Sequence, residues 1–239
     1  MTDSPSPLAI PLSSPNPYEN PELLAAFPEG LRPGGLSLTR LALAFCQFPR
    51  GAFLLDMGCG SGVTLEFLAQ AGFQVLGLDK SESLIKLARL KGPAQLASFE
   101  SLPLADQVAD GLFSECVLSL AQDKALVLGE WRRVLKKGAF IVISDLLLKS
   151  PNLTPKPASS PLTCAAGALT SLALCQLLND AGFRVQLAQD HGPLLKSLAA
   201  SLLWRFGSLK KLAQLWPGAC LGEFEAKNLT YGLIIGEAI

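Results

Sequence analysis

The chain has 239 residues, which is enough for one domain with additions and a sizeable hydrophobic core. Its 20 basic and 20 acidic side chains give a formal net charge of +0. Because binding to nucleic-acid phosphates normally needs a basic patch, this balance disfavours a nucleic-acid partner. Hydrophobic residues make up 49% of the chain and alternate between strand and helix patterns, which indicates an α/β fold.

The N-terminal part is predicted to be an extension of the main fold. Residues 1–17 are rich in serine and proline, which is typical of a mobile arm or an extended wrap. Residues 18–48 are expected to be helical, with a turn at 30–35 and a helix over 40–47. The first cationic side chain is Arg32, so we expect no secretory signal and a cytoplasmic protein.

A glycine-rich turn follows the first predicted strand, residues 52–55. The sequence of residues 56–62 is Asp-Met-Gly-Cys-Gly-Ser-Gly, and residues 64–71 are predicted to be a helix. Glycine permits a sharp turn and the close approach of a ligand, and the helix start offers free N–H groups. A second buried strand over 73–78 ends at Asp79, where a carboxylate can accept hydrogen bonds from a ribose diol. This pattern predicts a site for a nucleoside-containing cofactor.

Two common nucleotide-binding motifs do not fit this turn. The nicotinamide fingerprint needs glycine at position 63, where the chain has Val63, and no Gly-Lys-Ser/Thr follows to make a P-loop. The remaining pattern is an acidic residue two positions before Gly58, the Gly-Cys-Gly-Ser-Gly run, and Asp79. In these residues the chain resembles the class I S-adenosylmethionine-dependent methyltransferases.

The resemblance covers roughly residues 50–190. Residues 100–106 look like the family's loop before strand four, and residues 109–115 look like that strand. Residues 131–139 resemble the family's R-V-L-K-P-G-G turn, with Lys137 and Ala139 in place of proline and glycine. The segment after them is similar to strand five. The nearest relatives implied are quinone-biosynthesis, arsenite and small-molecule methyltransferases.

The resemblance implies that S-adenosylmethionine is the cofactor. Gly58 and Gly60 would pass under its methionine end, with Asp56 near its amino group, and Asp79 would bind the ribose. Ser98 stands where many relatives carry an aspartate for the adenine amino group. The residues expected at the cofactor are Asp56, Gly58, Cys59, Gly60, Asp79, Lys80, Ser98, Phe99 and Glu115.

Three residues are candidates for catalysis. Cys116 and Asp145 come at the ends of strands four and five, where the family places groups near the methyl donor. His191 is the single histidine and follows Asp190, so it is a candidate proton acceptor near neutral pH.

Three further residues are candidates for binding the substrate: Tyr18, Arg32 and Cys164. Arg32 lies between glycines in an apolar segment, where its guanidinium is suited to a carboxylate or phosphate. Cys164 follows a proline-rich loop at 146–162, and together with Cys116 it is suited to a soft element. The six cysteines have no C-x-x-C spacing, so we expect reduced thiols and no metal site.

These observations predict a Rossmann-like, doubly wound sheet of seven strands whose last strand is antiparallel. An arm and helical extension (1–48) would precede the methyltransferase domain (49–239). Residues 193–227 would form a helical insertion, a pair of helices split at 207–208. Together with the extension at 18–35 it would close as a lid over the pocket, with the helix around 41–45 as the nearest surface for its apolar side chains.

The expected activity is methyl transfer from S-adenosylmethionine to a small molecule, by a monomer or homodimer without a membrane partner. Two alternatives remain. One is methylation of arsenite or another soft element through Cys116 and Cys164. The other is a non-catalytic accessory protein that keeps the cofactor pocket.

Overall fold

The computed structural model describes residues 17–152, 164–208, 211 and 226–239. The proline-rich arm before residue 17, most of the loop after strand five and the second predicted helix of the 193–227 insertion lie outside these residues.

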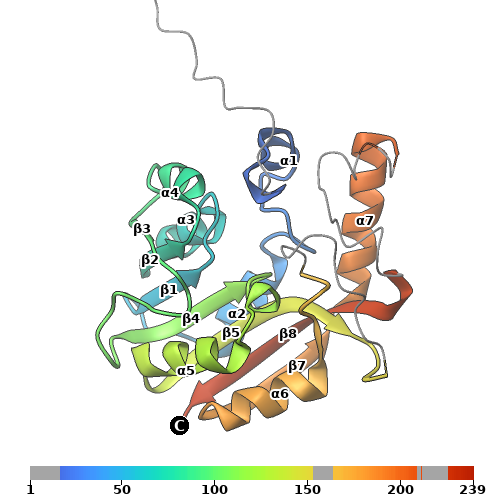
Figure 1. Cartoon of the computed structure of the whole chain (residues 1–239). Helices are drawn as coiled ribbons and strands as arrows, with labels where there is room; N and C mark the ends of the chain where they lie inside the picture. The colour runs from blue at the N-terminus through green and yellow to red at the C-terminus, as the bar shows by residue number, and fades with distance from the viewer. Residues whose placement is uncertain (1–16, 153–163, 209–210, 212–225) are drawn as a thin grey trace, which may run out of the picture.

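One twisted sheet forms the centre of the molecule (Figure 1), in the order β3-β2-β1-β4-β5-β8-β7. The strands from β3 to β5 are parallel, and β8 is antiparallel to both β5 and β7. The predicted fold class is therefore confirmed, and a short β6 that pairs with β5 adds an eighth strand. The strands are β1 (Phe53–Met57), β2 (Gln74–Asp79), β3 (Ala94–Leu96), β4 (Ala109–Glu115), β5 (Leu135–Leu148), β6 (Leu169–Thr170), β7 (Phe183–Asp190) and β8 (Leu229–Ala238).

Helices cover both faces of the sheet, which is why β1 is apolar on both sides. Leu54 packs in one core cluster with residues of α2, α3 and α4, and Leu55 packs in a second with residues of α5 and α6. The helices are α1 (Pro21–Ala26), α2 (Ser37–Cys46), α3 (Val63–Gln70), α4 (Glu82–Ala88), α5 (Lys124–Val134), α6 (Ser171–Asp180) and α7 (Gly192–Phe206), with short 3-10 turns at Pro17–Glu19, Leu118–Leu120 and Ala226–Asn228.

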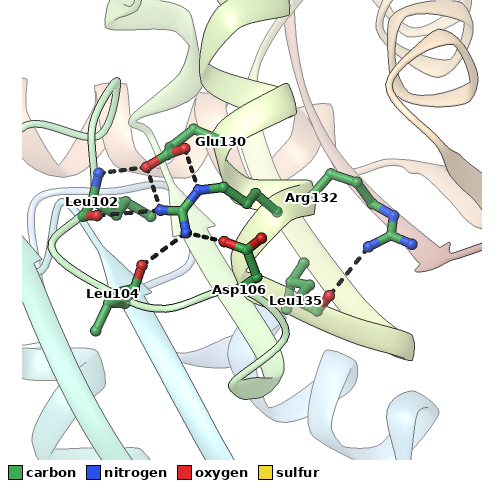
Figure 2. A network of polar contacts seen from close by, with 7 residues as sticks. Leu102, Leu104, Asp106, Glu130, Arg132 and Leu135 are labelled. Carbon is green, nitrogen blue, oxygen red and sulfur yellow. Dashed lines mark hydrogen bonds and ion pairs between the residues drawn. The ribbon is translucent and has the colours of Figure 1, made fainter.

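The loop before β4 is fixed to α5 by one guanidinium (Figure 2). Arg133 donates to the Glu130 carboxylate at 2.7 and 2.8 Å, to Asp106 at 2.6 Å, and to the carbonyls of Leu102 and Leu104. Arg133 is the first residue of the Arg-Val-Leu segment that resembles the family's turn. After that segment Gly138 has a φ of +79°, a conformation that suits glycine.

The predicted loop at 146–162 begins later than expected. β5 continues through Leu148, because Leu146, Leu147 and Leu148 pair with residues 231, 230 and 229 of β8. The polar Asp145 does not end the strand, because its carboxylate accepts a hydrogen bond from the backbone amide of Leu146 at 2.8 Å.

Helix α7 lies beside α1, above the carboxyl edge of the parallel strands (Figure 1). Leu202 and Phe206 are buried against Leu23 of α1, not against the helix around 41–45 that the sequence suggested. The first turn of α7 does approach that region, because Leu194 packs on the core cluster to which α2 contributes. Within the described ranges, no helix is long and apolar enough to span a bilayer.

Candidate functional site

A cavity opens where the parallel strands end, covered by the segment that carries α1. Its empty volume is about 1030 Å³, a value that includes the part open to solvent. Ten predicted site residues line it: Tyr18, Arg32, Gly58, Cys59, Gly60, Asp79, Lys80, Phe99, Glu115 and Cys116. Five others, Asp56, Ser98, Asp145, Cys164 and His191, are not among the residues that line it.

The glycine loop forms the floor of this cavity. A Cβ atom on Gly58 would lie 2.4 Å from Val117, and one on Gly62 would lie 2.9 Å from Ala88, so both glycines allow close packing. Gly60 differs, because a Cβ there would have no heavy atom within 4 Å and would enter the cavity. With a φ of +54°, Gly60 brings bare backbone to the space where a ligand lies.

Asp79 holds the far side of the loop. Its Oδ2 accepts from the backbone amide of Gly60 at 2.9 Å, and its Oδ1 accepts from the amide of Ser81 at 2.8 Å. Burial raises the pKa of this carboxyl, while both amides lower it. Beyond Asp79, the Nζ of Lys80 lies 5.7 Å from the centre of the Phe99 ring. The Phe99 ring is a flat apolar part of the cavity wall that Asp79 also lines.

Arg32 and Glu115 form an ion pair on the opposite side. Nη1 of Arg32 lies 2.8 Å from Oε2 of Glu115, and the two side chains are 12% and 4% exposed. The Glu115 carboxylate also accepts from the hydroxyls of Thr39 at 2.6 Å and Thr64 at 2.5 Å. Sequence reasoning missed these two threonines. The signal was available, because each is a polar residue at a buried position of an amphipathic helix.

Asp56 lies beneath the loop, completely buried behind the residues that line the cavity. Burial and the nearby Glu115 carboxylate raise its pKa to about 8, against the lowering effect of Arg32. Its Oδ2 has no hydrogen-bond partner among the residues that the structure describes. The same holds for Nη2 of Arg32, so one buried acceptor and one buried donor are both unsatisfied near the loop.

Two pairs of thiol and phenol groups lie beyond Glu115. The Sγ of Cys116 is 3.3 Å from the hydroxyl of Tyr231, and the hydroxyl of Tyr18 is 2.9 Å from the Sγ of Cys164. The Cys164 thiol also donates to the backbone carbonyl of Cys116 at 3.8 Å. Cys116 has a φ of +59°, which is unusual for a residue with a side chain and is typical of functional sites.

Comparison with known proteins decides the family. A family model described as a methyltransferase domain matches residues 55–143. The O-methyltransferase resE of Aspergillus sclerotiorum is 31% identical over 219 residues, which cover 84% of this chain and 81% of that protein. The chain belongs to the class I S-adenosylmethionine-dependent methyltransferases.

Two other proteins illustrate how far the similarity extends. A malonyl-[acyl-carrier protein] O-methyltransferase of Hamiltonella defensa is 39% identical over 102 residues, 41% of this chain and 40% of that protein. This chain therefore spans less than half the length of that relative. The structure of phosphoethanolamine N-methyltransferase 2 of Haemonchus contortus, solved with S-adenosyl-L-methionine, gives a TM-score of 0.72 at 17% identity and covers 90% of this chain and 56% of that one. At this identity the structural match supports the fold alone.

Three residues predicted for the methyltransferase site lie apart from the cavity. Ser98 points to the surface, where its hydroxyl donates to Glu100 at 3.0 Å. Asp145 is buried near a small second cavity, and its carboxylate accepts from the amide and hydroxyl of Ser119 at 2.9 and 2.6 Å. His191 occupies the N-cap position of α7 without a side-chain capping hydrogen bond, and its Nε2 lies 3.3 Å from the Gln189 side chain. The fold does not bring these three to the other candidates.

Proposed function

We propose that the chain binds S-adenosylmethionine in this cavity and methylates a small apolar molecule, most suitably at an oxygen atom. The observation that carries the proposal is the space above Gly60, bounded on one side by Asp79 and on the other by Glu115. Asp79 and Phe99 suit the ribose and the base of a nucleoside, and the glycine loop between them and Glu115 leaves room for a chain to pass over its backbone.

The carboxyl groups near the loop suit a cationic ligand. Arg32 compensates the Glu115 carboxylate, and Asp56, whose pKa is about 8 in the ligand-free protein, can ionise when a positive charge binds. The unsatisfied Oδ2 of Asp56 lies below the loop, on the side where the resemblance puts the amino group of methionine. A positive charge above the loop would therefore be stabilised, and it would favour the ionised form of Asp56.

When bound, S-adenosylmethionine supplies a methyl group that is already activated by a positively charged sulfur atom. The work left to this chain is to bind, to orient the acceptor and to exclude water. The apolar part of the cavity lining suits these tasks. It includes Leu23, Leu24, Leu31, Val117 and Leu120.

The same walls point to an acceptor that is acidic by itself. Among the described groups that line the cavity, Glu115 is saturated by three donors, and Asp79 is held by two amides. The hydroxyl of Tyr18 and the thiol of Cys116 contact Cys164 and Tyr231 behind the wall. An acceptor such as a phenol or enol loses its proton to water without a basic side chain. The O-methyltransferase names of two relatives agree with an oxygen acceptor.

Methylation of a soft element stays a second candidate. Cys116 lines the cavity, and the thiol of Cys164, which does not line it, lies 3.8 Å from the Cys116 carbonyl. Metalloid-dependent formation of S-adenosylhomocysteine that disappears in both Cys116→Ser and Cys164→Ser would support it.

The cytoplasmic location and the monomeric or homodimeric state remain predictions from the sequence.

The binding site is tested by calorimetry with S-adenosylhomocysteine and two matched variants. Asp79→Ala should weaken binding by about 1.5–3 kcal/mol, the usual loss for a charge-assisted hydrogen bond. Asp110→Ala is the control, because Asp110 caps the start of β1 and pairs with Lys136 away from the cavity. Unchanged affinity in a folded Asp79→Ala protein would remove the assignment. Methyl transfer to a panel of phenols then tests the activity.

A further inference from the structure

The ion pair of Arg32 and Glu115 joins a residue inside the matched family domain to one outside it. Arg32 belongs to the segment between α1 and α2, outside the matched residues 55–143. Its Nε donates to the carbonyl of Gly35 at 2.8 Å and its Nη1 contacts Glu115, so two sides of the guanidinium are fixed. The third side, Nη2, is buried and has no partner within the described part of the chain.

Glu115 is fixed even more completely. Each oxygen of its carboxylate accepts from a threonine hydroxyl, one on α2 and one on α3, and Oε2 also contacts Arg32. A carboxylate with its lone pairs occupied in this way has little capacity left for a ligand. Its position makes it the counter-ion that orients Arg32, and not the direct contact of the cofactor that was expected from the sequence.

A buried guanidinium N–H without an acceptor is costly unless a ligand supplies the acceptor. Arg32 lines the cavity, and the planar guanidinium matches the two oxygens of a carboxylate.

The distance between Asp79 and Glu115 along the sheet also fits such a ligand. Asp79 ends β2 and Glu115 ends β4, with β1 between them, so the two carboxylates are separated by roughly 10 Å at about 4.8 Å per strand. An extended nucleoside thioether has its ribose and its amino-acid end at such a separation.

We propose that Arg32, oriented by Glu115, Thr39 and Thr64, binds the carboxylate at the amino-acid end of the cofactor and so selects ligands that carry this end. The inference rests on the proposed function, and it changes the role of Arg32 from a contact of the acceptor to a contact of the cofactor. Thr39, Thr64 and Glu115 are positioning residues that act through Arg32.

The test compares two ligands by calorimetry: S-adenosylhomocysteine, and 5′-methylthioadenosine, which lacks the amino-acid end. The wild-type protein should bind S-adenosylhomocysteine at least tenfold more tightly. In Arg32→Met this preference should fall to less than about threefold, while the affinity for 5′-methylthioadenosine stays within a factor of two. Arg40→Met is the control and should keep the full preference, because Arg40 lies on α2 over the Phe67 ring.

Two more variants separate orientation from charge and provide for a failure of Arg32→Met to fold. Arg32→Lys keeps the positive charge but loses the two parallel N–H donors of the guanidinium. This variant should therefore lose a large part of the preference for S-adenosylhomocysteine over 5′-methylthioadenosine. The double variant Thr39→Val/Thr64→Val keeps the shape of both side chains and removes the donors to Glu115, so it too should lower the preference without changing 5′-methylthioadenosine binding.

The possible results of these binding measurements separate the role of Arg32 from the proposed function. Equal losses for both ligands in Arg32→Met, or a full preference in it, would overturn the role of Arg32. Equal affinities of the wild-type protein for the two ligands would also overturn it, although the nucleoside site would stand. A wild-type protein that binds neither ligand would overturn the proposed function itself.

Discussion

Gly60 and Gly72 have the same backbone requirement in different surroundings. Their φ angles are +54° and +94°, and a Cβ on either one would have no heavy atom within 4 Å. Only Gly60 lines the cavity. Valine at either position should destabilise the fold by about 1–3 kcal/mol, because a branched side chain is strained at positive φ.

Binding should separate the two variants. Gly60→Val should lose nearly all affinity for S-adenosylhomocysteine, since the side chain fills the space above the loop, whereas Gly72→Val should bind as the wild-type protein does. Calorimetry on both proteins below their melting temperatures makes the comparison. Similar affinities for the two variants would mean that the ligand does not pass over Gly60.

Asp56 should make the stability of the ligand-free protein depend on pH. Its pKa is about 8 in the folded protein against 3.8 as the ordinary value, because burial and Glu115 disfavour the charge. Between these values the folded protein keeps a proton that the unfolded chain has lost. The free energy of unfolding should therefore fall as pH rises from about 4 to about 8, by at most about 1.4 kcal/mol per unit.

Urea unfolding of the wild-type protein and Asp56→Asn at pH 5, 6.5 and 8 measures this slope. Asparagine does not ionise, so its stability relative to the wild-type protein should rise steadily with pH. A constant difference between the two proteins would show that Asp56 is already ionised in the fold near pH 5.

The residues at the site differ in how far the sequence predicted them. Asp56, Gly58 and Gly60 lie within five consecutive residues, and Asp79 follows at the next strand end, so their pattern is local. The contact of Arg32 with Glu115 joins two distant segments through the tertiary fold, and no local pattern relates them. Because the resemblance begins at about residue 50, it carried no information on the N-terminal segment.

At the scale of elements, α1 and α7 form one unit over the cavity. Leu23 of α1 lines the cavity and packs on Leu202 and Phe206 of α7, while Glu19, at the start of the segment, accepts from Ser81 beside Asp79. We expect residues 17–35 and 192–206 to move together as a lid.

Hydrogen exchange with and without S-adenosylhomocysteine tests the lid. Both segments should exchange more slowly with the ligand, and more so than β1 to β5, because the ligand contacts the wall that α1 supplies. In Phe206→Ala the protection should decrease in both segments. Identical exchange with and without ligand would make them fixed structure.

The strands show where reasoning from the sequence was reliable and where it failed. β1 and β2 are short, apolar on both faces and bounded by glycine, so their pattern predicted them within a residue or two. The end of β5 was predicted too early, because Asp145 looks like a strand end. Its carboxylate is satisfied by Ser119 and Leu146, which allows the strand to continue along β8.

The whole molecule should contain six reduced thiols. Five of the cysteines lie in the described part of the chain, where none forms a disulfide, and Cys220 lies outside it. Burial raises the pKa of Cys46 to about 12 and that of Cys116 well above its ordinary value, so few thiolates exist at neutral pH. A thiol reagent should therefore react slowly with the native protein and titrate six groups after denaturation. Fewer than six would indicate an oxidative link or a bound metal.

The place of β8 sets the order in which this chain is completed during synthesis. β8 follows β7 in sequence but lies between β5 and β7 in the sheet, and β7 pairs only with it in the described structure. On the ribosome, β7 and the outer edge of β5 must wait without a partner while residues 191–228 are made, for several seconds at about 5–20 residues per second. During that interval the apolar edge of β5 is open to other nascent chains. Synonymous codons that slow translation between β7 and β8 would lengthen this exposure without altering a single side chain.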